Sequence, residues 1–294
     1  MRVLRTLGLG TAVLAMILSS AAAAPAAENT RPDEPASYYL ALGDSLATGY
    51  QAGVGSTNEG YTDVVHRYLK STQPNLRLVK LGCVGETSAT FVAGGRCSYE
   101  GATSQLEAAR DFLRRHPGEV SYVTLNIGAN DIHACVRPTG VDAACIPGAM
   151  NTVGSHLSTI VSALKEVGGA GPTYGGMGTF DPLLATWLSG PSGRQVARQS
   201  VELVDAFNAM ENKIYRDAGY RVVDTDRIWL THDFEHTVRT LEYGTVPVNV
   251  GMICSLTTMC DKGDLHPNRL GYAYMGAAFY AGISAGSPQG EAMS

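Results

Sequence analysis

The chain has 294 residues, a formal net charge of −5 and 17% charged side chains. An acidic chain with few charges lacks the basic surface that binds nucleic-acid phosphates, so we expect no nucleic-acid partner. Once a leader segment is set aside, the remaining length is typical of one α/β domain with a sizeable core, and we expect a monomer.

The first residues have the pattern of a secretory signal peptide. Two arginines precede an apolar run over 7–18, and an alanine-rich stretch follows it. The run is shorter than the roughly 20 residues that span a bilayer, and no later stretch is apolar enough to do so. We therefore predict a signal peptide over 1–26, cut after Ala26 or Ala23, and one exported domain over 27–294 without stable membrane insertion. A retained N-terminal anchor is the alternative.

Six cysteines follow the predicted signal peptide, which fits an oxidising compartment. Many pairings are possible, and the simplest joins neighbours in the sequence, so that each bond closes one surface loop. No pair has the C-x-x-C spacing of a metal site, and we expect neither a metal nor a cofactor. The predicted pairs are Cys83 with Cys97, Cys135 with Cys145, and Cys254 with Cys260.

Strand-like segments alternate with helical patterns along the rest of the chain. This alternation predicts an α/β fold, a three-layer α/β/α sandwich around a mostly parallel sheet. The fourth strand segment is rich in glycine, and residues 225–263 are predicted to be irregular. The predicted strands are 37–42, 76–81, 120–127, 172–177 and 220–224, and the predicted helices are 61–69, 104–116, 150–167, 194–218 and 269–283.

A serine follows the first predicted strand in a short turn, Gly43-Asp44-Ser45. Loops at the carboxyl ends of parallel strands form the ligand crevice of open α/β sheets. A turn there can present a hydroxyl to substrate while backbone N–H groups point the same way. We take Ser45 as a candidate nucleophile; a turn that only caps a helix is the alternative.

Two more strand ends and one late histidine complete a possible site. Gly85 follows the second strand, Asn130 follows the third, and His266 precedes the last helix. Acyl transfer to water needs a nucleophile, a base and donors to the oxyanion. Ser45 would supply the hydroxyl, His266 the base, and the N–H groups of Ser45 and Gly85 with the Asn130 amide the oxyanion hole.

Four short motifs in order carry a family resemblance: Gly43-Asp44-Ser45-Leu46, Gly85-Glu86-Thr87, Gly128-Ala129-Asn130-Asp131 and Asp264-Leu265-His266-Pro267-Asn268. Together they resemble the SGNH hydrolases, also called GDSL esterases and lipases. The resemblance implies a flavodoxin-like five-stranded sheet, a Ser45/His266 pair and the oxyanion hole named above. It also implies a secreted serine esterase or lipase that hydrolyses small-molecule or lipid esters through an acyl-enzyme. The three cysteine pairs look like those of secreted actinobacterial members.

One residue departs from the family pattern. The family usually has its acid three residues before the histidine, where this chain has Gly263, and Asp264 stands only two residues before His266. Residues i and i+2 of an extended segment point to the same side, so Asp264 can still reach the imidazole. Either Asp264 or a backbone carbonyl orients the ring.

A second motif predicts a different enzyme. The segment from His232 to His236 matches H-x-x-E-H, in which two histidines one helical turn apart bind zinc and the intervening Glu235 acts as base. The residues around it are poor helix formers, and no third ligand can be named. A zinc metalloprotease using His232, Glu235 and His236 is therefore the alternative function.

Overall fold

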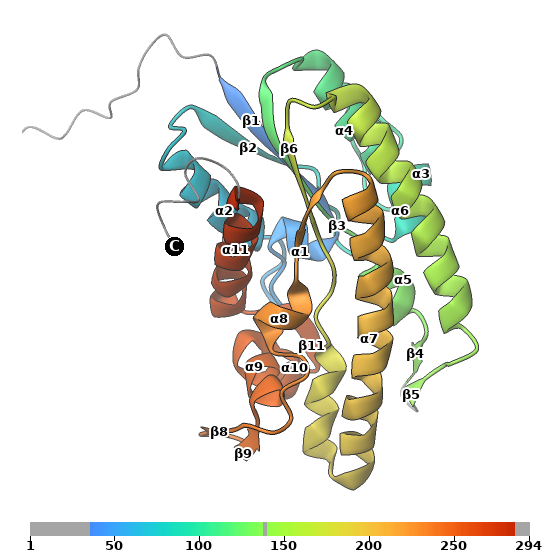
Figure 1. Cartoon of the computed structure of the whole chain (residues 1–294), viewed down its shortest axis with the longest axis vertical. Helices are drawn as coiled ribbons and strands as arrows, with labels where there is room; N and C mark the ends of the chain where they lie inside the picture. The colour runs from blue at the N-terminus through green and yellow to red at the C-terminus, as the bar shows by residue number, and fades with distance from the viewer. Residues whose placement is uncertain (1–35, 138–139, 286–294) are drawn as a thin grey trace, which may run out of the picture. The chain divides into compact units, whose positions relative to one another are not determined.

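The computed structural model describes residues 36–137 and 140–285, so the predicted signal peptide lies outside the described residues. The centre of the fold is a five-stranded parallel sheet with the order β2-β1-β3-β6-β7 (Figure 1). This is the flavodoxin-like order, and the predicted fold class is confirmed. Its strands are β1 (Ser37–Gly43), β2 (Leu76–Lys80), β3 (Val120–Asn126), β6 (Thr173–Met177) and β7 (Arg221–Val223).

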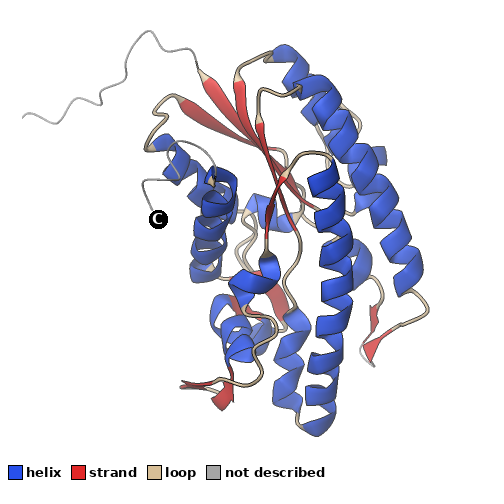
Figure 2. Ribbon diagram, in the orientation of Figure 1, coloured by secondary structure: helices blue, strands red, loops and turns tan. Residues whose placement is uncertain are grey.

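Strand β1 shows why helices cover the sheet on both sides. Tyr39 and Ala41 point into one hydrophobic cluster, whereas Leu40 and Leu42 point into the other, and all four are fully buried. A strand that is apolar at every position needs packing on both faces. The helices supply that packing from either side (Figure 2).

The helices divide between the two faces as a three-layer sandwich requires. On one face α2 packs against α11, with the Tyr61 and Phe279 rings stacked 5.2 Å apart. The other face carries α4, α6 and α7, whose buried side chains meet the second cluster. These helices are α2 (Tyr61–Lys70), α4 (Gln105–Arg115), α6 (Ile146–Gly168), α7 (Pro191–Asp217) and α11 (Arg269–Ser284).

The glycine-rich strand predicted at 172–177 is β6, and its glycines have a packing role. A β-carbon on Gly175 would lie 2.6 Å from the Ile283 side chain, and one on Gly176 would lie 2.5 Å from the Tyr215 ring. Large side chains from α11 and α7 thus press on β6 from both faces. Only glycine leaves room for them.

The prediction that 225–263 is irregular is wrong. This stretch folds into short elements that are two to nine residues long, too short for a hydrophobic period to show. Helix α9 buries residues around most of its circumference, so it has no apolar stripe. The elements are α8 (Thr225–Trp229), β8 (Thr237–Thr240), β9 (Gly244–Pro247), α9 (Val248–Leu256), β10 (Thr257–Thr258) and α10 (Met259–Lys262).

Further short elements follow the carboxyl ends of the strands, and the three disulfides lie among them. The bonds join Cys83 to Cys97, Cys135 to Cys145 and Cys254 to Cys260, as the sequential pairing predicts. Among the described residues, no helix combines the length and apolar character needed to cross a membrane. The short elements are α1 (Ser45–Thr48), α3 (Ser88–Ala93), α5 (Ala129–His133), β4 (Val136–Arg137), β5 (Gly140–Val141), the 3₁₀ helix η1 (Pro182–Ser189) and β11 (Asp264–Pro267).

Candidate active site

The turn after β1 holds Ser45 in a fixed backbone position. Gly43 has φ +133°, and a β-carbon there would collide with the carbonyl of Asn126 on β3. Asp44 caps α1 by accepting from the Leu46 N–H at 2.9 Å, and it also accepts from the Asn126 amide at 2.8 Å. Ser45 is therefore the first residue of a capped helical turn. This turn follows the end of β1, which lies between β2 and β3 in the sheet.

Ser45 meets His266 and Asp264 in one line of contacts. The Ser45 Oγ lies 2.8 Å from His266 Nε2, and His266 Nδ1 lies 2.8 Å from Asp264 Oδ1. Because Asp264 accepts from Nδ1–H, the lone pair on Nε2 is left to accept the serine proton. The geometry suits a hydroxyl nucleophile with an oriented base.

Asp264 reaches the ring because β11 is extended, as the i, i+2 spacing predicts. The same Oδ1 also accepts from the His266 backbone N–H at 2.9 Å, and the Thr258 hydroxyl lies 3.4 Å from it. Partial burial acts to raise the pKa of the Asp264 carboxyl, but the hydrogen bonds from the backbone N–H and the ring of His266, with the electrostatic interaction of that ring, outweigh burial and hold that pKa below its ordinary value. The carboxylate is thus ionised and available to the imidazolium.

Asn130 lies in α5, directly beyond β3. Its Nδ2 donates one hydrogen to the Glu86 carbonyl at 2.8 Å, which fixes the amide and leaves the second N–H for another acceptor. Gly85 precedes Glu86 in the turn after β2, with φ +75°, and a β-carbon there would collide with the Arg96 guanidinium. The structure therefore brings Asn130 and the Gly85 turn together.

A buried amide that the sequence did not reveal ties these parts together. Gln105, fully buried at the start of α4, accepts from the Gly43 N–H at 2.7 Å and donates to the Gly43 carbonyl at 2.9 Å. It also donates to Glu86 Oε2 at 3.0 Å. A glutamine in the first turn of an amphipathic helix ordinarily faces solvent, so no sequence signal identified this one.

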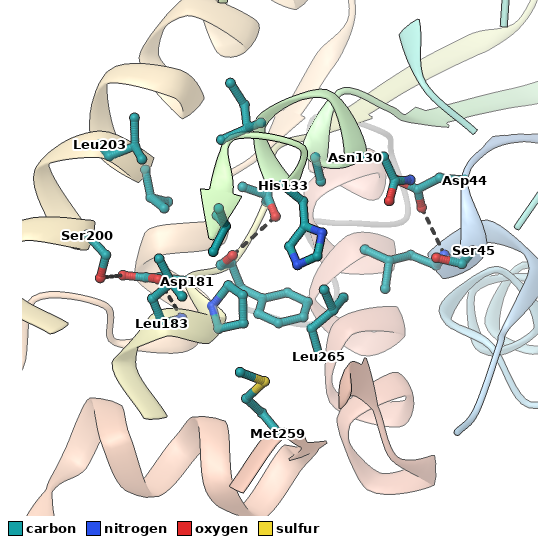
Figure 3. Close-up of a pocket in the computed structure, with 18 of the residues that line it drawn as sticks. Asp44, Ser45, Asn130, His133, Asp181, Leu183, Ser200, Leu203, Met259 and Leu265 are labelled. Carbon is teal, nitrogen blue, oxygen red and sulfur yellow. Dashed lines mark hydrogen bonds between the residues drawn. The ribbon is translucent and has the colours of Figure 1, made fainter. Parts of the chain in front are cut away.

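A cavity of about 170 Å³ extends from Ser45 and is lined mostly by apolar side chains. In Figure 3, Ser45 and Asn130 lie at one end, and Ser200 and Leu203 lie at the opposite end. Phe180 and η1 form one wall of the cavity. The sequence did not predict the wall formed by α7. A helical period shows which face of a helix is buried, but it does not show whether that face lines a cavity.

Two buried carboxyls flank the cavity. Burial raises the pKa of Asp44 to about 6, against the hydrogen bonds from Leu46 and Asn126 that act to lower it. Burial likewise raises the pKa of Asp181 to about 6, although Ser200 and the Leu183 N–H donate to it. Both acids hold backbone turns through these bonds.

The H-x-x-E-H segment lacks the geometry of a zinc enzyme. It is not helical, so its two histidines are not one helical turn apart. His232 Nε2 lies 3.2 Å from Asp205, whereas His236 Nδ1 lies 3.1 Å from Asp233. Within the part of the chain that the structure describes, no three His, Cys, Asp or Glu residues are grouped to hold a metal ion. The segment therefore lacks the helical zinc-site geometry that the metalloprotease alternative requires, and nothing in the described residues supports that alternative.

Comparison with known proteins gives one family match. The model of the GDSL-like lipase/acylhydrolase family matches residues 41–274. No curated protein matches the chain.

Several solved structures are similar to this one at low sequence identity. The YXIM protein of Bacillus subtilis has a TM-score of 0.50 and 14% identity, over 88% of this chain and 59% of that one. The crystal structure of TesA has a TM-score of 0.47 and 13% sequence identity, over 84% of this chain and 98% of that one. The psychrotrophic esterase EstA from Pseudoalteromonas sp. has a TM-score of 0.44 and 16% sequence identity, over 84% of this chain and 96% of that one. The first of these similarities shows a shared fold.

Proposed function

The chain belongs to the GDSL-like lipase/acylhydrolase family, and on that premise we propose that it hydrolyses carboxylic esters through an acyl-enzyme on Ser45. One observation carries the proposal. The Ser45 hydroxyl, the His266 ring and the Asp264 carboxylate form an unbroken line of hydrogen bonds at the end of an apolar cavity. This is the arrangement that activates a serine for acyl transfer.

The proposed reaction has two halves. In the first, His266 Nε2 takes the Ser45 proton as Oγ attacks the ester carbonyl, and the protonated ring then gives that proton to the departing alcohol. In the second, water attacks the acyl-enzyme with His266 again as base, and the protonated ring returns that proton to Ser45 Oγ as the acid is released. Asp264 stays ionised throughout and stabilises the imidazolium. No step uses a metal or cofactor.

The oxyanion of each tetrahedral intermediate needs donors that are already in place. We assign this role to the backbone N–H groups of Ser45 and Gly85 and to the free N–H of the Asn130 amide. Two features support the assignment. Asn130 and Ser45 line the same cavity, and the Asn130 amide is held by the carbonyl next to Gly85.

Secretion is the further part of the proposal. Three disulfides suit an oxidising compartment, and residues 1–26 have a signal-peptide pattern. The resemblance of the cysteine pairs to secreted actinobacterial relatives supports the same proposal.

All the proposed catalytic groups come from one chain, so activity as a monomer requires no second subunit. The substrates are small-molecule or lipid esters.

Labelling with a fluorophosphonate tests the nucleophile. We expect the probe to modify Ser45 and abolish hydrolysis of p-nitrophenyl esters, and a metal chelator to have no effect. Ser45→Ala should lower kcat by several orders of magnitude, as loss of a serine nucleophile does in other enzymes. Ser158→Ala, which removes an exposed hydroxyl from α6, is the matched control and should keep full activity.

Two results would overturn the assignment. One is substantial activity in Ser45→Ala with an unfolding transition like that of the parent chain. The other is complete inhibition by the chelator while Ser45 stays unlabelled.

A further inference from the structure

We propose that the cavity beside Ser45 binds medium-chain acyl groups of about six to eight carbons, and that Leu203 on α7 sets the upper limit. The inference rests on the proposed function, because it takes Ser45 as the atom to which the acyl group becomes attached. It adds the substrate class and names a residue outside the catalytic line that determines chain length.

The lining of the cavity fits a hydrocarbon chain. Most of its polar groups gather at two ends, the catalytic end with Ser45 and Asn130 and the far end with Ser200 hydrogen-bonded to Asp181 at 2.6 Å, and the ring of His133 lies between them (Figure 3). Between these ends the walls are largely apolar, and an alkyl chain there loses no hydrogen bonds to water. The apolar lining comes from α1, α5, η1, α7 and the β10–β11 region and includes Leu46, Ile132, Phe180, Leu183, Met259 and Leu265.

The cavity size sets the scale of the chain. A dry apolar cavity of roughly 150 Å³ holds a benzene molecule, which has six carbons. The cavity here is about 170 Å³ and therefore has room for a slightly longer apolar fragment. Each methylene that enters it should raise kcat/KM by about fourfold, until the far wall is reached.

The far wall is thin. Ser200 and Leu203 line this cavity, and both also line a second hollow of about 470 Å³ on the other side. The second hollow is bounded mainly by the segment from Val141 to Pro147 and by Val196. Figure 3 shows Leu203 at the end of the first cavity that lies opposite Ser45. A smaller residue at 203 would join the two spaces, whereas a larger one would shorten the first.

The test is a series of p-nitrophenyl esters from acetate to palmitate. For the parent chain we expect kcat/KM to rise to a maximum near hexanoate or octanoate and then fall. Leu203→Ala should move the maximum to longer chains and raise kcat/KM for laurate or longer esters by tenfold or more. Leu203→Trp should move it toward butyrate. Val196→Ala is the matched control, since Val196 lines only the second hollow, and its profile should equal that of the parent chain.

Fluorophosphonate labelling of Ser45 in each variant separates the two proposals. Inert esters together with an unlabelled Ser45 would mean that the proposed function has failed. A labelled, active enzyme whose maximum is at acetate or palmitate, or whose maximum does not move in Leu203→Ala, would overturn the acyl-length inference alone. If Leu203→Trp does not fold, the parent profile and Leu203→Ala decide the question.

Discussion

The ring of His266 is held by residues at very different distances along the chain. Ser45 is 221 positions away, so this contact depends on the whole fold. Asp264 is two positions away on the same short strand, and it binds both the ring and the backbone N–H of His266. The orienting contact is therefore local, and it can be removed without disturbing the sheet.

Asp264→Ala tests whether this carboxylate or a backbone carbonyl orients the base. We expect kcat/KM to fall by about 10⁴-fold, the scale found when the acid of a serine triad is removed. Asp261→Ala, an exposed aspartate three residues earlier, should have no effect. Ester hydrolysis at saturating and limiting substrate measures both. A loss below tenfold for Asp264→Ala would assign the role to a backbone group instead.

At the residue scale, the sequence identified the groups that make up motifs. Ser45, Asn130 and His266 follow or precede predicted elements in a recognisable order, and the i, i+2 spacing predicted that Asp264 reaches the His266 ring where that segment is extended. Gln105 could not be identified in this way. Its function depends on the depth at which α4 packs, which is a property of the assembled layers.

Two buried amides hold strand ends in the same manner, and only one of them lies next to Ser45, the proposed nucleophile. Gln105 bonds both the N–H and the carbonyl of Gly43, two residues before Ser45. Asn208 on α7 bonds both the N–H and the carbonyl of Thr179, just beyond β6. Each side-chain amide makes the pair of backbone hydrogen bonds that a neighbouring strand would make, and each is almost fully buried.

This pairing provides a controlled test of positioning. Gln105→Leu and Asn208→Leu should each lower the free energy of unfolding by about 1–3 kcal/mol, because each leaves buried backbone groups unpaired. Only Gln105→Leu should also slow the fluorophosphonate reaction of Ser45 and lower kcat on a short ester, by tenfold or more with little change in KM. Urea unfolding and labelling rates measure the two effects. Equal labelling rates in both variants would show that Gln105 only stabilises the fold.

At the element scale, length decided what could be predicted. Each long helix was found near its predicted position, because its hydrophobic period repeats often enough to be read. The strands of the main sheet were also found near their predicted positions, and the glycine-rich β6 was placed because the alternation of elements required a strand between two helices. Two helix starts were placed late, at 150 and 194, whereas α6 and α7 begin at Ile146 and Pro191, each with a proline in the first turn. The short elements that carry His266 gave no periodic signal.

At the scale of the whole molecule, buried acids make stability depend on pH. The pKa of Asp181 is raised to about 6 by burial, and Asp226 and Asp205 nearby add to the shift. Well below pH 4 this carboxyl is neutral in both the folded and unfolded states. As pH rises from 4 through 6 the unfolded state ionises first, so the contribution of Asp181 to stability is lost over that window.

Asp181→Asn should remove this loss. Relative to the parent chain, the variant should gain about 2–3 kcal/mol in free energy of unfolding between pH 4 and pH 7.5, as a shift of this size implies. Urea unfolding at the two pH values measures the difference. Asp217→Asn, an exposed position at the end of α7, should follow the parent chain at both. A constant offset for Asp181→Asn would contradict the linkage.

All three disulfides lie outside the main sheet, in the segments that carry the candidate site. None of the five strands contains a cysteine. Cys83 lies two residues before Gly85, Cys135 closely follows Asn130, and the Cys254–Cys260 bond closes the turn before β11. In a reducing cytoplasm the strands of the sheet would thus lack no bond, whereas the segments that carry Gly85, Asn130 and His266 would not be cross-linked by their disulfides. Export, as proposed above, would therefore let these disulfides form only after the chain has left the cytoplasm.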